Sequence, residues 1–147
     1  MRVVTWNINS VRLRINSVKK VVKKLNPDIL CLQETKCLKE DFPFEDFEKM
    51  GFVDTEAIGI KGYNGVCIAS KHPISSIDKH IFFNKDDARH MNIEFLYKNK
   101  KIIIHNFYVP AGGDEPDPKI NAKFKHKLKF LEEATKLFSN KKSAKND

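Results

Sequence analysis

The chain has 147 residues, and its 27 basic and 19 acidic residues give a formal net charge of +8 at neutral pH. This length is sufficient for one domain with a buried core. The charge favours an anionic partner such as nucleic acid, although lysines spread over solvated helix faces would give the same balance. No apolar run is long enough to cross a membrane and no signal peptide is evident, so we expect a cytoplasmic protein without membrane contact. The three cysteines lack metal-ligand spacing and are expected to be reduced thiols.

The first elements are predicted to be a strand and a helix. Residues 2–7 favour a β-strand, which ends on polar side chains that begin with Asn7. Apolar residues then recur at the helical period, and Asn9 or Ser10 can cap the first turn. The helix is stopped by Pro27. The apolar residues on its expected buried face are Val11, Ile15, Val18, Val22 and Leu25.

A second strand follows this helix. Residues 29–32 form a continuous apolar run, which is typical of a strand buried in a parallel sheet, and Glu34 follows near its carboxyl end. Because a strand, helix, strand unit makes its two strands parallel, Asn7 and Glu34 are expected at one edge of one sheet. An amide beside a carboxylate suits a hard cation or a phosphate. A single glutamate after a strand is, however, more often a solvated loop residue.

The rest of the chain is predicted to alternate strands with two further helical segments. These elements are a short helix within 42–50, strands over 53–60, 66–70, 74–83, 91–97 and 102–110, an amphipathic helix over 121–139, and a disordered polar tail over 140–147. Tyr108 ends the last strand, where its hydroxyl can bind a phosphate or simply lie at the rim of the core. The guanidinium of Arg89 suits phosphate binding, or an ion pair with Asp86 or Asp87.

Four ordered motifs resemble the exonuclease–endonuclease–phosphatase superfamily. The segments Thr5-Trp6-Asn7-Ile8-Asn9-Ser10-Val11-Arg12 and Leu32-Gln33-Glu34-Thr35-Lys36 are similar to the opening motifs of its exodeoxyribonuclease III branch. That branch contains the abasic-site endonucleases of DNA base excision repair. The other two motifs are Lys61-Gly62-Tyr63-Asn64-Gly65-Val66 and Asn106-Phe107-Tyr108-Val109-Pro110. The resemblance covers the chain from Met1 to about Phe138.

The resemblance implies an α/β fold, specifically the N-terminal half of a four-layered α/β sandwich. We expect one mixed β-sheet with two main amphipathic helices, in a partial domain over residues 1–139. The resemblance also implies Mg²⁺ (or Mn²⁺) as cofactor, with Glu34 and Asn7 at the metal and Tyr108 as a catalytic residue. The implied partner is double-stranded DNA with abasic sites or 3′ ends. The residues implied to contact DNA are Arg12, Lys36 and Arg89.

Two motifs that the resemblance leads one to expect, Gly-Asp-x-Asn and Ser-Asp-His, are not among the 147 residues. We therefore expect a truncated form that binds metal weakly and has little or no nuclease activity alone. A complementing C-terminal half or self-association would cover the exposed sheet face. Two other functions stay open. One is a non-catalytic nucleic-acid-binding or interaction module, and the other is a different phosphodiesterase branch acting on phospholipid, inositol phosphate or RNA tails.

Overall fold

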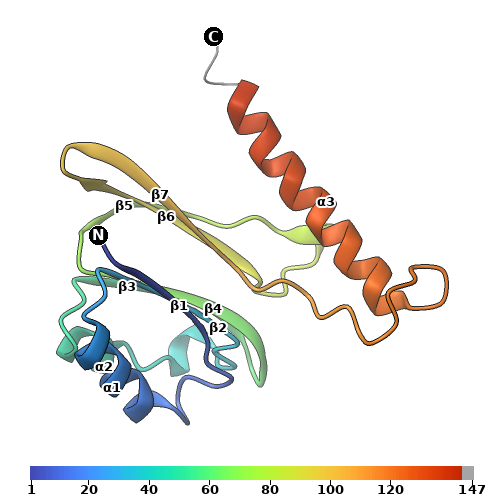
Figure 1. Ribbon diagram of the computed structural model, residues 1–147. Coiled ribbons are helices and arrows are strands. Elements are labelled where there is room, and N and C mark those ends of the chain that lie inside the picture. The colour runs from blue at the N-terminus through green and yellow to red at the C-terminus, as the bar shows by residue number, and fades with distance from the viewer. Residues whose placement is uncertain (144–147) are drawn as a thin grey trace. The chain divides into compact units, whose positions relative to one another are not determined.

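The computed structural model describes the backbone of residues 1–143 and the side chains of residues 1–139 (Figure 1). The strands are β1 (Val3–Asn7), β2 (Ile29–Gln33), β3 (Asp54–Ile60), β4 (Tyr63–Ser70), β5 (Ile74–Asp78), β6 (His90–Tyr97) and β7 (Lys100–Phe107). The helices are α1 (Ile15–Leu25), α2 (Phe44–Lys49) and α3 (Ala122–Ser143), with short 3₁₀ turns at Lys39–Asp41 and Phe82–Asn84. Within the described residues, no helix is long and apolar enough to span a membrane.

The predicted unit of strand, helix and strand is confirmed. Strand β1 pairs in parallel with β2, in a register that sets Asn7 opposite Gln33. Helix α1 buries Val18 and Val22, as the apolar spacing requires. The helix begins four residues later than Val11, because residues 11–14 form a turn that follows the positive-φ residues Asn9 and Ser10. The predicted caps are therefore wrong, since Asn9 and Ser10 have φ of +47° and +82° and lie before that turn.

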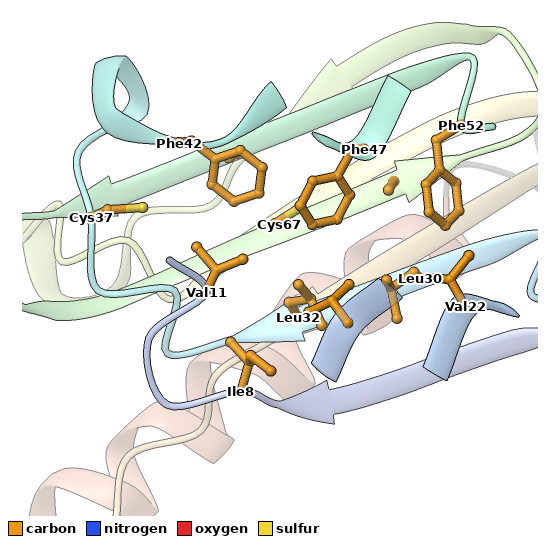
Figure 2. Packing of buried hydrophobic residues seen from close by; sticks show 13 residues of the cluster. Ile8, Val11, Val22, Leu30, Leu32, Cys37, Phe42, Phe47, Phe52 and Cys67 are labelled. Atoms are coloured by element: carbon orange, nitrogen blue, oxygen red, sulfur yellow. The ribbon is translucent and has the colours of Figure 1, made fainter. Parts of the chain in front are cut away.

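The first sheet has four strands in the order β1-β2-β4-β3, and β4 runs antiparallel to both of its neighbours. Side chains alternate along its strands, so the central strands β2 and β4 each serve two cores. Leu30 and Leu32 of β2 face the core beneath α1 and α2, which also holds Phe47 (Figure 2). Full burial of such a side chain stabilises the fold by about 1.5–3 kcal/mol.

The second sheet has three antiparallel strands in the order β5-β6-β7. Met91, Ile93 and Phe95 of β6 pack against Ile29 and Cys31, on the face of the first sheet opposite α1 and α2. The α/β class is thus confirmed, but the strands form two sheets where we expected one. Apolar residues alternate with polar ones in β6. Its apolar face is buried against the first sheet and not against a helix, which explains why β6 belongs to a second sheet.

A separate compact unit contains residues 82–85 and the described part of the chain from Val109 to residue 143. Within this unit the ring of Phe82 stacks on that of Phe130, with centroids 4.0 Å apart. Asn121 precedes α3, and its Oδ1 accepts hydrogen bonds from the backbone nitrogens of Lys123 and Phe124. The helix ends at Ser143, so the first four residues of the tail that we predicted to be disordered are helical. The remaining part of that prediction, residues 144–147, lies outside the described residues.

Candidate active site at the carboxyl ends of three strands

Asn7, Glu34 and Tyr108, which we call the rim cluster, meet although they are far apart in sequence. Asn7 is the last residue of β1. Glu34 directly follows β2, and Tyr108 directly follows β7. The side-chain amide of Asn7 donates a hydrogen bond of 2.7 Å to Glu34 Oε1. Tyr108 also lies close enough for its hydroxyl to lower the pKa of the Glu34 carboxylate. An amide, a carboxylate and a phenol therefore occupy one edge of the packed sheets, as the sequence predicted.

The backbone around Glu34 is held in an unusual conformation. Glu34 and Lys36 have φ of +56° and +54°, in the left-handed region that costs a residue with a side chain about 1–2 kcal/mol. Backbone hydrogen bonds on both sides fix this loop. The Glu34 carbonyl accepts from the nitrogen of Ser10 at 2.7 Å, and the Lys36 nitrogen donates to the Asn64 carbonyl at 2.9 Å. The carboxylate is thus carried on a strained turn that backbone hydrogen bonds hold in place, and such strain is common at functional sites.

Gly65 allows this turn to approach β4. A Cβ atom at Gly65 would lie 2.2 Å from Oγ1 of Thr35, and the residue has a φ of +92°. The nitrogen of Thr35 also donates to the Gly65 carbonyl at 3.2 Å. Only glycine satisfies both the conformation and the close contact. The motif that contains Gly65 therefore packs against the motif that contains Glu34.

The contacts of the rim cluster shift two pKa values in opposite directions. The hydrogen bond from Asn7 is the largest influence on Glu34 and lowers its pKa, and bonds from Tyr108 and Lys36 act in the same direction against the effect of burial. Burial is the largest influence on Tyr108 and raises its pKa, and the bond to Glu34 adds to this. At neutral pH the site therefore holds an ionised carboxylate and a neutral phenol, which can donate a hydrogen bond.

Two of the three predicted DNA-contacting residues lie beside the rim cluster. Lys36 Nζ is 3.3 Å from Glu34 Oε2 and donates to the Asn9 side chain at 2.6 Å. The Arg89 guanidinium lies 4.8 Å above the ring of Tyr108, and its Nε is 2.6 Å from Asp87. The ion pair that we kept as an alternative for Arg89 is therefore present, together with a stacking contact to the site.

Arg12, the third predicted DNA contact, is not brought against the rim cluster. Its guanidinium lies 3.9 Å from Asp41 on the 3₁₀ turn, and both side chains are about half exposed. An exposed ion pair of this kind contributes little to stability. The predicted role of Arg12 in DNA binding stays a prediction.

The sequence analysis missed a buried polar network just beneath the rim cluster. Asn106 of β7 is 2% exposed and accepts a hydrogen bond of 2.7 Å from the side chain of Gln33. Gln33 also donates to the hydroxyl of Thr5 at 3.0 Å. The available signal was Asn106 itself, because a polar residue inside a strongly apolar strand is costly to bury without partners.

The donor set of the rim cluster fits a hard divalent cation. Glu34 offers carboxylate oxygens, and Asn7 offers an amide oxygen while its nitrogen holds Glu34 in place. Mg²⁺ prefers oxygen ligands, needs only one or two carboxylates, and keeps several waters. Among the described residues, no group of three or more His, Cys, Asp or Glu side chains could enclose a metal.

The rim cluster lies at the carboxyl ends of strands in two packed sheets of an α/β fold. Residues 4–141 match the Endonuclease/Exonuclease/phosphatase family. Because this match covers most of the chain, the protein belongs to that family.

Similar proteins narrow the branch within the family. The chain is 29% identical to exodeoxyribonuclease III of Haemophilus influenzae, in a match covering 88% of this chain and 48% of that protein. It is also 29% identical to a DNA-(apurinic or apyrimidinic site) endonuclease of Dictyostelium discoideum, in a match covering 77% of this chain and 31% of that protein. The predicted similarity to exodeoxyribonuclease III and abasic-site endonucleases is thereby confirmed.

Solved structures agree with these relatives. An AP endonuclease from Archaeoglobus fulgidus is 34% identical, with a TM-score of 0.75, and the match covers 90% of this chain and 48% of that one. A 3′ phosphatase from Neisseria, bound to a product DNA hairpin, has a TM-score of 0.80 at 27% identity, covering 97% of this chain and 53% of that one. The chain thus spans about half the length of these two structures, and half or less of the two relatives named above.

Proposed function

We propose that this chain carries the part of a divalent-metal-dependent phosphodiesterase site that holds the metal and the phosphate, and that its substrate is DNA with abasic sites or 3′ ends. The observation that carries the proposal is the hydrogen-bonded rim cluster of Asn7, Glu34 and Tyr108. Similarity to exodeoxyribonuclease III and to AP endonucleases supports DNA as the substrate class.

Each residue of the rim cluster has a separate task in this proposal. Glu34 binds Mg²⁺ (or Mn²⁺), and Asn7 fixes the direction of the carboxylate. The bound cation would neutralise charge on the scissile phosphate. Tyr108 keeps its proton at neutral pH and, with DNA bound, would donate it in a hydrogen bond to a phosphate oxygen in place of Glu34. Lys36 and Arg89 add positive charge beside that oxygen.

We propose further that residues 1–147 alone bind such DNA but hydrolyse it slowly. The sequence contains neither a Gly-Asp-x-Asn nor a Ser-Asp-His motif, which would supply the groups that orient and activate the attacking water. A cation held by one carboxylate would bind weakly, because water fills its remaining coordination positions. Catalytic groups that act as a unit lose most of their effect when one is missing.

We also propose a complementing set of strands as a partner. Among the described strands, β1, β3, β5 and β7 each pair on one side only. The edges of β1 and β7 border one crevice, which is lined by Thr5 and Gln33 on one side and by His105 and Phe107 on the other. An unpaired edge is a template for another strand. A C-terminal half supplied by further chain could pair at both of these edges and complete the site, whereas a second copy could cover the edges only.

Binding of an abasic duplex tests the proposed function. A labelled duplex with one abasic analogue is titrated with the protein in Mg²⁺, and an undamaged duplex of the same sequence serves as reference. We expect the abasic duplex to bind more tightly than the undamaged one, with cleavage slow or absent. Glu34→Gln should reduce the gain in affinity that Mg²⁺ gives. Glu40→Gln is the matched control, because Glu40 is exposed. Equal binding of both duplexes, unaffected by Mg²⁺, would reject the proposal in favour of a non-catalytic binding module.

A further inference from the structure

The rim cluster is supported by a second layer of polar side chains, Thr5, Gln33 and Asn106, which we call the inter-sheet bridge. We infer that the inter-sheet bridge is a positioning device, which fixes the Tyr108 hydroxyl against the Glu34 carboxylate across the two sheets. This inference rests on the proposed function for its consequence in DNA binding. Its geometric part concerns the folded chain alone.

Asn106 uses its whole side-chain amide in the inter-sheet bridge. Its nitrogen donates to the carbonyls of Leu32 in β2 and Cys67 in β4, both at 2.9 Å. Its oxygen accepts from Gln33 Nε2 at 2.7 Å. Asn106 belongs to the second sheet and these three partners belong to the first. One side chain therefore joins the two sheets by three directed hydrogen bonds.

Each residue of the inter-sheet bridge lies one or two residues before a residue of the rim cluster in the sequence. Thr5 precedes Asn7 by two residues in β1, and Asn106 precedes Tyr108 by two residues at the end of β7. Residues two apart in a strand lie on the same face. Gln33 is the residue immediately before Glu34, and it is bonded to both Thr5 and Asn106. The bridge thus links the same three strands, β1, β2 and β7, as the rim cluster does.

The other contacts between the two sheets do less to fix the rim cluster. The Ile74 nitrogen in β5 donates to Asp54 Oδ2 in β3 at 2.7 Å, but the register places Asp54 level with Ile29, at the opposite end of β2 from Gln33. The core between the sheets consists of apolar side chains, among them Ile29, Ile68, Ile93 and Phe95. Dispersion and burial of apolar groups have no preferred direction, so such a core tolerates small shifts of one sheet over the other. Hydrogen bonds lose strength steeply with distance and angle. A shift that separated Glu34 from Tyr108 would also break bonds of buried groups in the bridge, which is expensive.

Variants of the inter-sheet bridge separate positioning from simple stabilisation. Asn106→Ala removes all three bonds, and Gln33→Met removes only those of Gln33 with little change in volume. Ile104→Val is the matched control, because Ile104 is a neighbour of Asn106 in β7 that packs between the sheets without joining the bridge. The readout is the nuclear Overhauser contact between the Tyr108 ring and the Glu34 side chain, recorded with urea stability for each variant.

We expect the Tyr108 to Glu34 contact in the wild type and in Ile104→Val, and its loss in folded Asn106→Ala and Gln33→Met. If Asn106→Ala does not fold, Gln33→Met carries the test. If either folded bridge variant keeps the contact and is only less stable, the bridge serves stability alone and the inference is wrong. The affinity of the wild type and of the bridge variants for abasic duplex in Mg²⁺ is measured separately, and we expect the variants to lose about tenfold or more. If the wild type binds no abasic duplex, the proposed function fails while the contact measurement still decides the geometric inference.

Discussion

At the scale of single residues, Glu34 and Tyr108 have pKa values shifted in opposite directions. The hydrogen bond from Asn7 is the main influence that lowers the pKa of Glu34, and burial is the main influence that raises the pKa of Tyr108, while the interaction between the two side chains adds to both shifts. Opposite shifts in neighbouring groups are how a site assigns one residue to hold charge and another to donate a proton. In the proposed function, these two roles would be set by the folded chain itself.

The lowered pKa of Glu34 predicts an acid-dependent loss of stability. Above the ordinary glutamate pKa of 4.5, Glu34 is ionised in both the folded and unfolded states, and its contacts contribute fully. Below 4.5 the unfolded chain takes up the proton first, so the free energy of unfolding falls until the lower pKa of the folded state is passed. Urea denaturation from pH 6 to pH 3 should show a steeper loss for the wild type than for Glu34→Gln. Parallel curves for the two proteins would show that Glu34 has no lowered pKa.

Removal of the Tyr108 hydroxyl should weaken binding of the abasic duplex. Tyr108→Phe keeps the ring under Arg89 but loses the donor, and a hydrogen bond to a charged group contributes about 1.5–3 kcal/mol. We therefore expect an affinity loss of about tenfold or more, measured by titration of the labelled duplex in Mg²⁺. Tyr97→Phe, whose hydroxyl accepts a bond from the N-terminal amine of Met1, is the control and should bind normally. An unchanged affinity of Tyr108→Phe would remove Tyr108 from the site.

At the scale of elements, strands and helices with a regular apolar period could be predicted from the sequence, and irregular segments could not. The buried face of α1 follows directly from the spacing of Val18 and Val22, and the continuous apolar run of β2 follows from its burial on both faces. The start of α1 could not be predicted, because it depends on residues such as Ser10 that adopt positive φ through bonds to the Glu34 loop. That bond joins distant segments, and no local pattern encodes it.

The candidate site divides in the same way. Asn7, Glu34 and Tyr108 could be placed together because each ends a predicted strand. The inter-sheet bridge could not, because its hydrogen bonds run between two sheets whose separation the sequence did not reveal. Likewise, Lys36 and Arg12 both belong to motifs that resemble the family, yet only Lys36 lies beside Glu34. Motifs give the residues of a site, and packing decides which of them meet.

The hairpin of β3 and β4 offers a test of the close approach at Gly65. Both Gly62 and Gly65 have positive φ, but a Cβ atom meets nothing within 4 Å at Gly62 and meets Thr35 Oγ1 at 2.2 Å at Gly65. Gly62→Ala should cost about 1–2 kcal/mol of unfolding free energy from conformation alone. Gly65→Ala should cost at least 1 kcal/mol more, because overpacking adds to the strain. Urea denaturation measures both, and equal losses would show that the contact with Thr35 is not tight.

At the scale of the whole molecule, the chain combines a basic net charge with the carboxylate of the rim cluster. In the proposed function, the net charge of +8 would attract DNA without regard to sequence, while the rim cluster would contact one phosphate. The edges of β1 and β7 border one crevice, so a complementing partner and DNA would meet the chain close together. Such a partner would add the missing catalytic groups without moving those already present.

The salt dependence of DNA binding tests this arrangement of charge. A plot of log affinity against log salt concentration should be steep for the wild type, because phosphate contacts release counterions. Lys36→Met removes a charge beside Glu34 and should lower the slope by about 1. Lys24→Met on exposed α1 should leave the slope unchanged. The reverse result would place the DNA on the face that carries α1.

The most direct test of the account is to locate a bound divalent cation. Mn²⁺ broadens the nuclear magnetic resonance signals of nearby atoms, so a titration of the labelled protein with Mn²⁺ maps its binding position. We predict broadening centred on Asn7, Glu34 and Tyr108, reversed by excess Mg²⁺ and absent in Glu34→Gln. Broadening centred on other carboxylates, such as Glu56 or Asp86, or unchanged in Glu34→Gln, would contradict the proposed metal and phosphate site.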